Sequence, residues 1–104
     1  MIRRITTTEA ADADIRDIAT YIAFDNEHAS RKFGAELWES FQRIAENPEI
    51  GHIVAEFSEL RVLRVSNRFR RYLVFYRSLG TETVEVVRVL HGARDITLLV
   101  RDIA

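Results

Sequence analysis

The sequence contains no cysteine, one lysine, one proline and only three histidines among its 104 residues. Without cysteine it can form neither a disulfide nor a thiolate zinc site, which agrees with a reducing cytoplasm. The histidines are scattered, so we expect no metal ion and no other cofactor. No window approaches the roughly 18 apolar residues of a membrane span, and the N-terminus lacks the apolar core of a signal peptide. We therefore expect one cytoplasmic domain over residues 1–104, without contact with a membrane.

Charges of opposite sign are concentrated in different halves of the chain. Residues 1–60 hold 12 acidic and 6 basic residues, whereas residues 61–104 hold 9 arginines and 4 acidic residues. A basic half of this kind can meet either the phosphates of a nucleic acid or an acidic segment of a protein. The segregation predicts a charged partner and leaves open whether the chain binds nucleic acid directly.

The first half of the chain is predicted to form one strand and two helices. Residues 2–6 are short and mixed in polarity, and we interpret them as a strand at or near a sheet edge. Apolar residues at helical spacing predict a helix over about residues 9–24, with an N-cap among the threonines at 6–8. A second helix begins after residues 25–26 and ends before Pro48, because proline disfavours a helical conformation in the residue before it.

The second half changes to strand periodicity. Residues 60–65, 71–77 and 84–90 are rich in β-branched and aromatic residues and are separated by short turns, so we expect antiparallel neighbours. The third of these segments is apolar at consecutive positions, which predicts an interior strand covered on both faces. After it, four apolar residues recur at the spacing of a short final helix: Ile96, Leu99, Val100 and Ile103.

The order of the elements, β-α-α-β-β-β-α, predicts an α+β fold. Two helices joined by a tight break form an antiparallel hairpin, and a small, mainly antiparallel sheet supplies the apolar face on which that hairpin can pack. The last helix is too short to be stable alone and must dock on the domain.

Two stretches resemble a known family in detail: YLVFYR at residues 72–77 and VEVVRVLHGARDI at residues 84–96. Weaker matches cover residues 14–22 and 29–51 and the Leu60-Arg61 pair. On these residues the sequence resembles the ParE branch of the RelE/ParE superfamily, the toxin halves of bacterial toxin–antitoxin modules. The resemblance implies a RelE/ParE-like fold and a growth-inhibiting cytoplasmic toxin of the kind that stabilises plasmids. It also implies a ParD-like antitoxin whose C-terminal segment wraps the toxin, and DNA gyrase as the usual target.

Six arginines without an intervening acid are the clearest chemical anomaly, at positions 61, 64, 68, 70, 71 and 77. They can be a sheet edge guarded by charge or a groove for acidic groups, and the sequence leaves both readings open. Our candidates for contact with the target are Arg61, Arg71, His91 and Arg94. Our candidates for contact with the antitoxin are Arg64, Arg68, Arg77, Ile96, Leu99, Val100 and Ile103. We expect the antitoxin to combine an apolar helix with an acidic strand or tail.

A ribosome-dependent endoribonuclease is the alternative that the superfamily allows. His91 can be a histidine that caps local carbonyls, or a general acid or base, because imidazole titrates near neutrality. In the second case, Glu56 or Glu59 would act as the base, Arg71 as the phosphate-binding cation and His91 as the acid. The nucleases of this superfamily carry lysine-rich strands, whereas the single lysine here, Lys32, lies on a helix. We therefore favour an inhibitor that acts by binding, and a module that only binds its antitoxin is a third reading.

Overall fold

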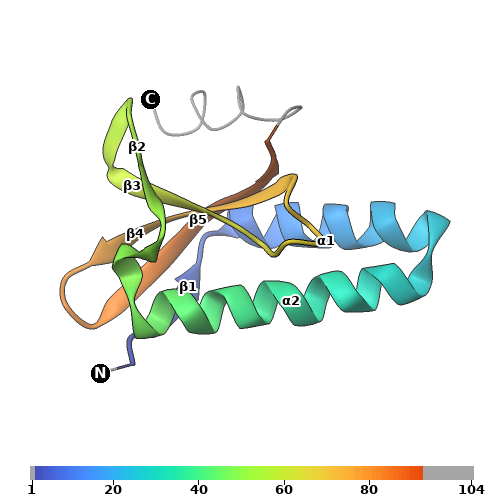
Figure 1. Ribbon diagram of the computed structural model, residues 1–104, viewed down its shortest axis with the longest axis horizontal. Coiled ribbons are helices and arrows are strands. Elements are labelled where there is room, and N and C mark those ends of the chain that lie inside the picture. Colours follow the sequence, from blue (N-terminus) through green and yellow to red (C-terminus); the bar gives the residue numbers. More distant parts are fainter. Residues whose placement is uncertain (1, 93–104) are drawn as a thin grey trace.

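The computed structural model describes residues 2–92, in which two helices cover one face of a five-stranded sheet (Figure 1). This is the α+β architecture that the sequence predicts. Arg94 and the final helix predicted over residues 96–103 lie outside the described residues. The elements are β1 Arg4–Thr7, α1 Glu9–Asp25, α2 Glu27–Glu46, the 3-10 turn η1 Pro48–Ile50, β2 His52–Val54, β3 Phe57–Arg64, β4 Tyr72–Leu79 and β5 Thr83–His91.

The strand order is β1-β5-β4-β3-β2, with β1 parallel to β5 and the other neighbours antiparallel. The prediction that β1 lies at an edge is confirmed, as is the prediction that β5 is an interior strand. The prediction of four strands was wrong, because β2 forms a fifth. Strand β2 has only three residues, and its pairing with β3 is irregular after Ile53. It is therefore too short to show the alternation of apolar and polar residues by which a strand is recognised in a sequence.

Side-chain caps fix the N-terminal ends of both helices. The cap of α1 is Thr8, the last of the three threonines, whose side chain accepts a hydrogen bond from the Ala11 amide. Asn26 caps both helices. Its backbone N–H donates to the Ile22 carbonyl, and its side-chain oxygen accepts from the backbone N–H of Ala29. One residue therefore ends α1 and begins α2, and the two helices lie side by side with their connection projecting beyond the sheet (Figure 1).

The main core lies between the helices and the sheet. Phe33 on α2 is fully buried and meets the rings of Phe69 and Tyr72 edge to face, at centroid distances of 5.3 and 5.4 Å. A smaller cluster occupies the other sheet face, where Leu60, Phe75 and Leu90 are at most 2% exposed. The sheet is thus packed on both faces, which explains why β5 is apolar at consecutive positions.

The packing around residue 51 leaves no room for a side chain, whereas the sequence alone indicated only that Gly51 permits a turn. Its φ of −77° is open to any residue, but a Cβ atom there would lie 2.5 Å from the hydroxyl of Tyr76. The Gly51 amide donates to that hydroxyl at 2.8 Å, and the hydroxyl donates to the Pro48 carbonyl at 2.7 Å. The close approach therefore ties the end of α2 and its following turn to the centre of β4.

Candidate functional site

Among the six clustered arginines, Arg61 and Arg77 donate side-chain hydrogen bonds within the domain. The Arg61 guanidinium donates to the carbonyls of Gly51 and Glu49, at 2.9 and 3.4 Å. Arg77 on β4 pairs with Glu85 on β5, with the Nη2–Oε1 atoms 2.9 Å apart. These contacts join β3 to the turn after α2 and β4 to β5, so both side chains contribute to the fold whatever else they contact.

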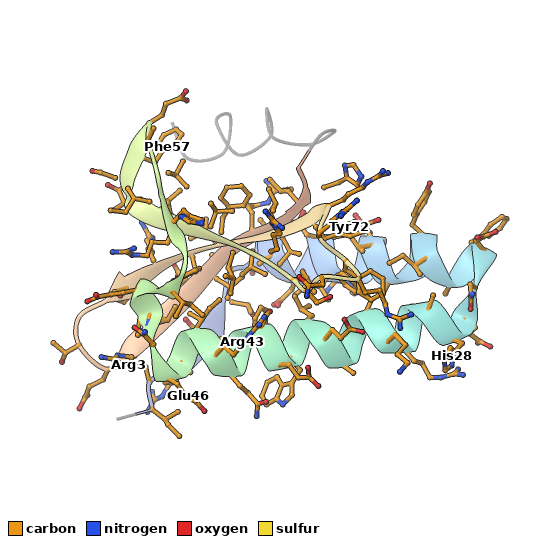
Figure 2. The ribbon with its side chains drawn as sticks, viewed as in Figure 1. Arg3, His28, Arg43, Glu46, Phe57 and Tyr72 are labelled. Carbon is orange, nitrogen blue, oxygen red and sulfur yellow. The ribbon has the colours of Figure 1, made fainter. Side chains whose placement is uncertain are left out.

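Arg64 and Arg68 line a hollow of about 740 Å³ beside the end of β3. Arg43 enters the same hollow from α2, on the side of the helix that faces the strands (Figure 2). We call this site the β3 hollow. It runs around the edge of the sheet, because Leu63 packs against the main core and Leu73 packs against the cluster on the other face. The structure therefore brings together two of the candidates for antitoxin contact and adds an arginine that the sequence had not singled out.

The charges in the β3 hollow are unbalanced. Arg43 donates to the Val65 carbonyl at 3.2 Å, and Arg68 lies 3.6 Å from the carboxylate of Glu36. Arg64 is exposed and has neither a hydrogen bond nor an ion pair within residues 2–92. Three guanidinium groups and one carboxylate line the hollow, so its charge is net positive and favours anionic groups of a partner.

Arg71 and His91 lie at the same end of the sheet. His91 pairs in register with Tyr72, whose ring it meets edge to face at 5.4 Å, and the Gly92 amide donates to the Arg71 carbonyl at 2.7 Å. Glu59 lies beyond Arg61, which pairs with Tyr76, so about six residues or roughly 20 Å of strand separate it from the level of His91. The structure does not assemble the Glu59, Arg71 and His91 trio of the nuclease reading.

The most buried ion pair among residues 2–92 joins α1 to β5. Asp14 on α1 accepts two hydrogen bonds of 2.7 Å from Arg88 on β5, and a third of 3.0 Å from the Val89 amide. An arginine inside an otherwise apolar strand was the one available signal, because a buried guanidinium needs an anionic partner.

Large apolar side chains are exposed at two further places. Phe24 and Tyr21, at the end of α1, are 96% and 65% exposed. Trp38 on α2 is 61% exposed and lines a 450 Å³ groove with Ile2, next to the point where the Arg3 side chain donates to the Glu46 carbonyl (Figure 2). Exposed aromatics of this size are typical of contact surfaces.

The described part of the chain has no cluster of three or more potential metal ligands. None of its helices has the length and hydropathy needed to cross a membrane.

Comparison with known proteins gives three findings. Residues 5–96 match the family model described as the ParE toxin of the type II toxin–antitoxin system parDE. Two strains of Mycobacterium tuberculosis, CDC 1551 and H37Rv, have a toxin ParE1 that is 32% identical over 99 residues, covering 92% of this chain and 96% of the relative. Among solved structures, the chromosomal ParDE system from P. aeruginosa matches with a TM-score of 0.69 at 17% identity, covering 86% of this chain and 96% of that one. That last match supports the fold.

Proposed function

We propose that this chain, which belongs to the ParE toxin family of type II toxin–antitoxin systems, inhibits growth by binding DNA gyrase and is held inactive by a ParD-like antitoxin. The family match over residues 5–96 carries the proposal. Exposed aromatic and basic surfaces suit a protein that acts by binding large partners. We further propose that the chain acts in the cytoplasm, where it would meet both partners.

The candidates for gyrase contact within residues 2–92 are Arg61, Arg71 and His91. Of these, Arg71 is exposed and Arg61 already binds two backbone carbonyls. We therefore assign the larger share of the target contact to Arg71 and the adjacent His91. Arg94, the fourth candidate, follows them closely in the sequence.

A supercoiling assay tests the target. Purified chain, added to gyrase and relaxed plasmid, should reduce supercoiling in proportion to its concentration, and prior addition of the antitoxin should restore it. Arg71→Glu should need a higher concentration for the same inhibition, whereas Arg16→Glu, an exposed arginine on α1, should not. Undiminished supercoiling at saturating toxin would refute gyrase as the target.

The adjacency of Arg71 and His91 keeps the endoribonuclease as a second candidate. A nuclease would cleave message in a translating extract, and His91→Ala would lower cleavage at least about 10²-fold if the imidazole transfers a proton. Intact message in the presence of toxin that stops growth would remove this candidate.

A further inference from the structure

We infer that the free edge of β1 pairs with the same edge of a second copy of this chain. The two strands are antiparallel about a two-fold axis beside Thr6, and they join the two sheets into one. This pairing requires neither gyrase nor an antitoxin.

Strand β1 ends the sheet, and only one of its sides is paired. The amides of Arg4 and Thr8 donate to carbonyls on the β5 side, at 2.8 and 3.1 Å. Because successive residues of a strand point their N–H and C=O groups to opposite sides, those of Ile5 and Thr7 face away from β5. No helix, turn or loop of residues 2–92 bonds to them. Open groups of this kind are a template for another strand.

The register of the added strand follows from how short this open edge is. The Arg3 amide, next on the same side, already donates to the Ala45 carbonyl at 3.0 Å. A two-fold axis perpendicular to the sheet makes two β1 strands antiparallel, and the pairing that uses both open residues sets Ile5 of each copy opposite Thr7 of the other. Thr6 then faces Thr6 of the second copy, a favourable cross-strand pair. A shift of two residues either way would set an open residue against Arg3 or against the first turn of α1.

The charges at the two ends of β1 complement each other in this register. Arg4 lies opposite Thr8 of the second copy, one residue before Glu9 at the start of α1. Arg4 and Glu9 are both exposed, and neither forms an ion pair or a side-chain hydrogen bond within residues 2–92. The two-fold axis sets this arginine near this glutamate at both ends of the paired strands. A second copy therefore supplies the matching backbone and the matching charges together.

The groove beside the β1 edge supplies apolar surface. Ile2 and Trp38, 74% and 61% exposed, line it together with Ile5 and Phe41. A strand added at this edge, with the first turn of its α1, would cover part of that surface and so favour association. Since β1 is only four residues long, the interface is small, and we expect a dimer that dissociates on dilution.

A single introduced thiol tests the pairing, because the chain has no cysteine. Opposite residues of a non-hydrogen-bonded antiparallel pair have Cα atoms about 4.5 Å apart, within the range that a disulfide spans. Thr6→Cys should therefore form an intermolecular disulfide at least about tenfold faster than Asp17→Cys, which places a thiol at an exposed position more than two turns into α1. Equal rates of crosslinking would overturn the inference.

Sedimentation equilibrium measures the dimer directly. The wild-type chain should shift from monomer to dimer as its concentration rises, and a monomer at every concentration would overturn the inference. Arg4→Glu and Glu9→Lys should each weaken association about tenfold, and the double variant should return it to within about threefold of wild type. Arg16→Glu, the same charge change on a later turn of α1, should leave association unchanged. A double variant that associates more weakly than either single variant would overturn the proposed register.

Amide hydrogen exchange distinguishes a second copy from an antitoxin strand. In the chain alone, exchange of the Ile5 and Thr7 amides should slow as the concentration of the chain rises. Exchange that does not depend on concentration and slows only when antitoxin is added would assign the edge to the antitoxin and overturn the inference. None of these measurements involves gyrase, so failure of the dimer and failure of the proposed function are distinguishable.

Discussion

Asp14 and Arg88 form a bidentate ion pair between α1 and β5, with both hydrogen bonds 2.7 Å long. The pairing of β1 with β5 ends at Thr7, which lies opposite Val86. The Asp14–Arg88 pair lies just beyond this point, where β5 has no neighbouring strand on that side within residues 2–92. Beyond it, the Thr8 hydroxyl donates to the Val87 carbonyl at 2.7 Å and Asp14 accepts from the Val89 amide. Side chains of α1 therefore satisfy the part of the β5 edge that β1 does not reach.

Removal of Asp14 should be strongly destabilising. The two side chains are only 12% and 9% exposed, so Asp14→Ala removes the carboxylate that pairs with a buried guanidinium and accepts a hydrogen bond from the Val89 amide. We expect a loss of about 3 to 5 kcal/mol in the free energy of unfolding, measured by urea denaturation. Asp17→Ala, on the exposed side of the same helix, should change it by less than about 0.5 kcal/mol. Similar values for the two variants would show that the pair does not hold α1 to the sheet.

Two glycine substitutions should have opposite effects. Gly51→Ala places a Cβ atom 2.5 Å from the Tyr76 hydroxyl and 2.9 Å from the Val62 carbonyl oxygen, and should cost about 1 to 3 kcal/mol. Gly34→Ala, in α2, meets no atom within 4 Å and should stabilise the protein by about 0.5 to 1 kcal/mol. Thermal unfolding of both variants measures the difference, and a stabilising Gly51→Ala would contradict the packing role of Gly51.

The Tyr76 hydroxyl should make the fold sensitive to alkaline pH. Burial raises the pKa of Tyr76 above the usual 10.0, an effect that its hydrogen bond from Gly51 and the nearby Arg61 charge only partly offset. The folded state thus holds the Tyr76 proton more tightly than the unfolded state. The contribution of this group to the free energy of unfolding is therefore fully present below pH 10 and is lost as the pH rises through the raised pKa. Urea denaturation from neutral to strongly alkaline pH should show this fall, and Tyr76→Phe should lose the part of it that this group causes. A pH dependence unchanged in Tyr76→Phe would assign the fall to other groups.

Equal truncations of two phenylalanines should separate the core from the surface. Phe33 is fully buried among aromatic rings, and Phe24 is 96% exposed. Phe33→Ala should cost about 3 to 5 kcal/mol, whereas Phe24→Ala should change stability by less than about 0.5 kcal/mol. Denaturation midpoints of the two variants give the comparison. A large loss of stability in Phe24→Ala would show that the Phe24 side chain packs against other residues and would contradict its exposed position.

Local pattern in the sequence determined the elements and their layers. Phe33 and Ile44 recur at helical spacing in α2 and are both buried, and the consecutive apolar residues of β5 predicted its interior position. Asn26 was recognisable as a cap because its side chain acts on an amide three residues away. These features depend on residues close together in the chain, and the spacing of those residues is enough to reveal them.

Only the tertiary structure decided which arginines remain available to a partner. Arg61, Arg64 and Arg77 look alike in the sequence, but strand register brings Arg77 opposite Glu85 and leaves Arg64 at an open edge. Asp14 and Arg88 are 74 residues apart, and Gly51 and Tyr76 are 25 apart, so no local spacing connects them. A shift of one residue in register would turn each strand side chain to the other face of the sheet, and register is set by the packing of the whole domain.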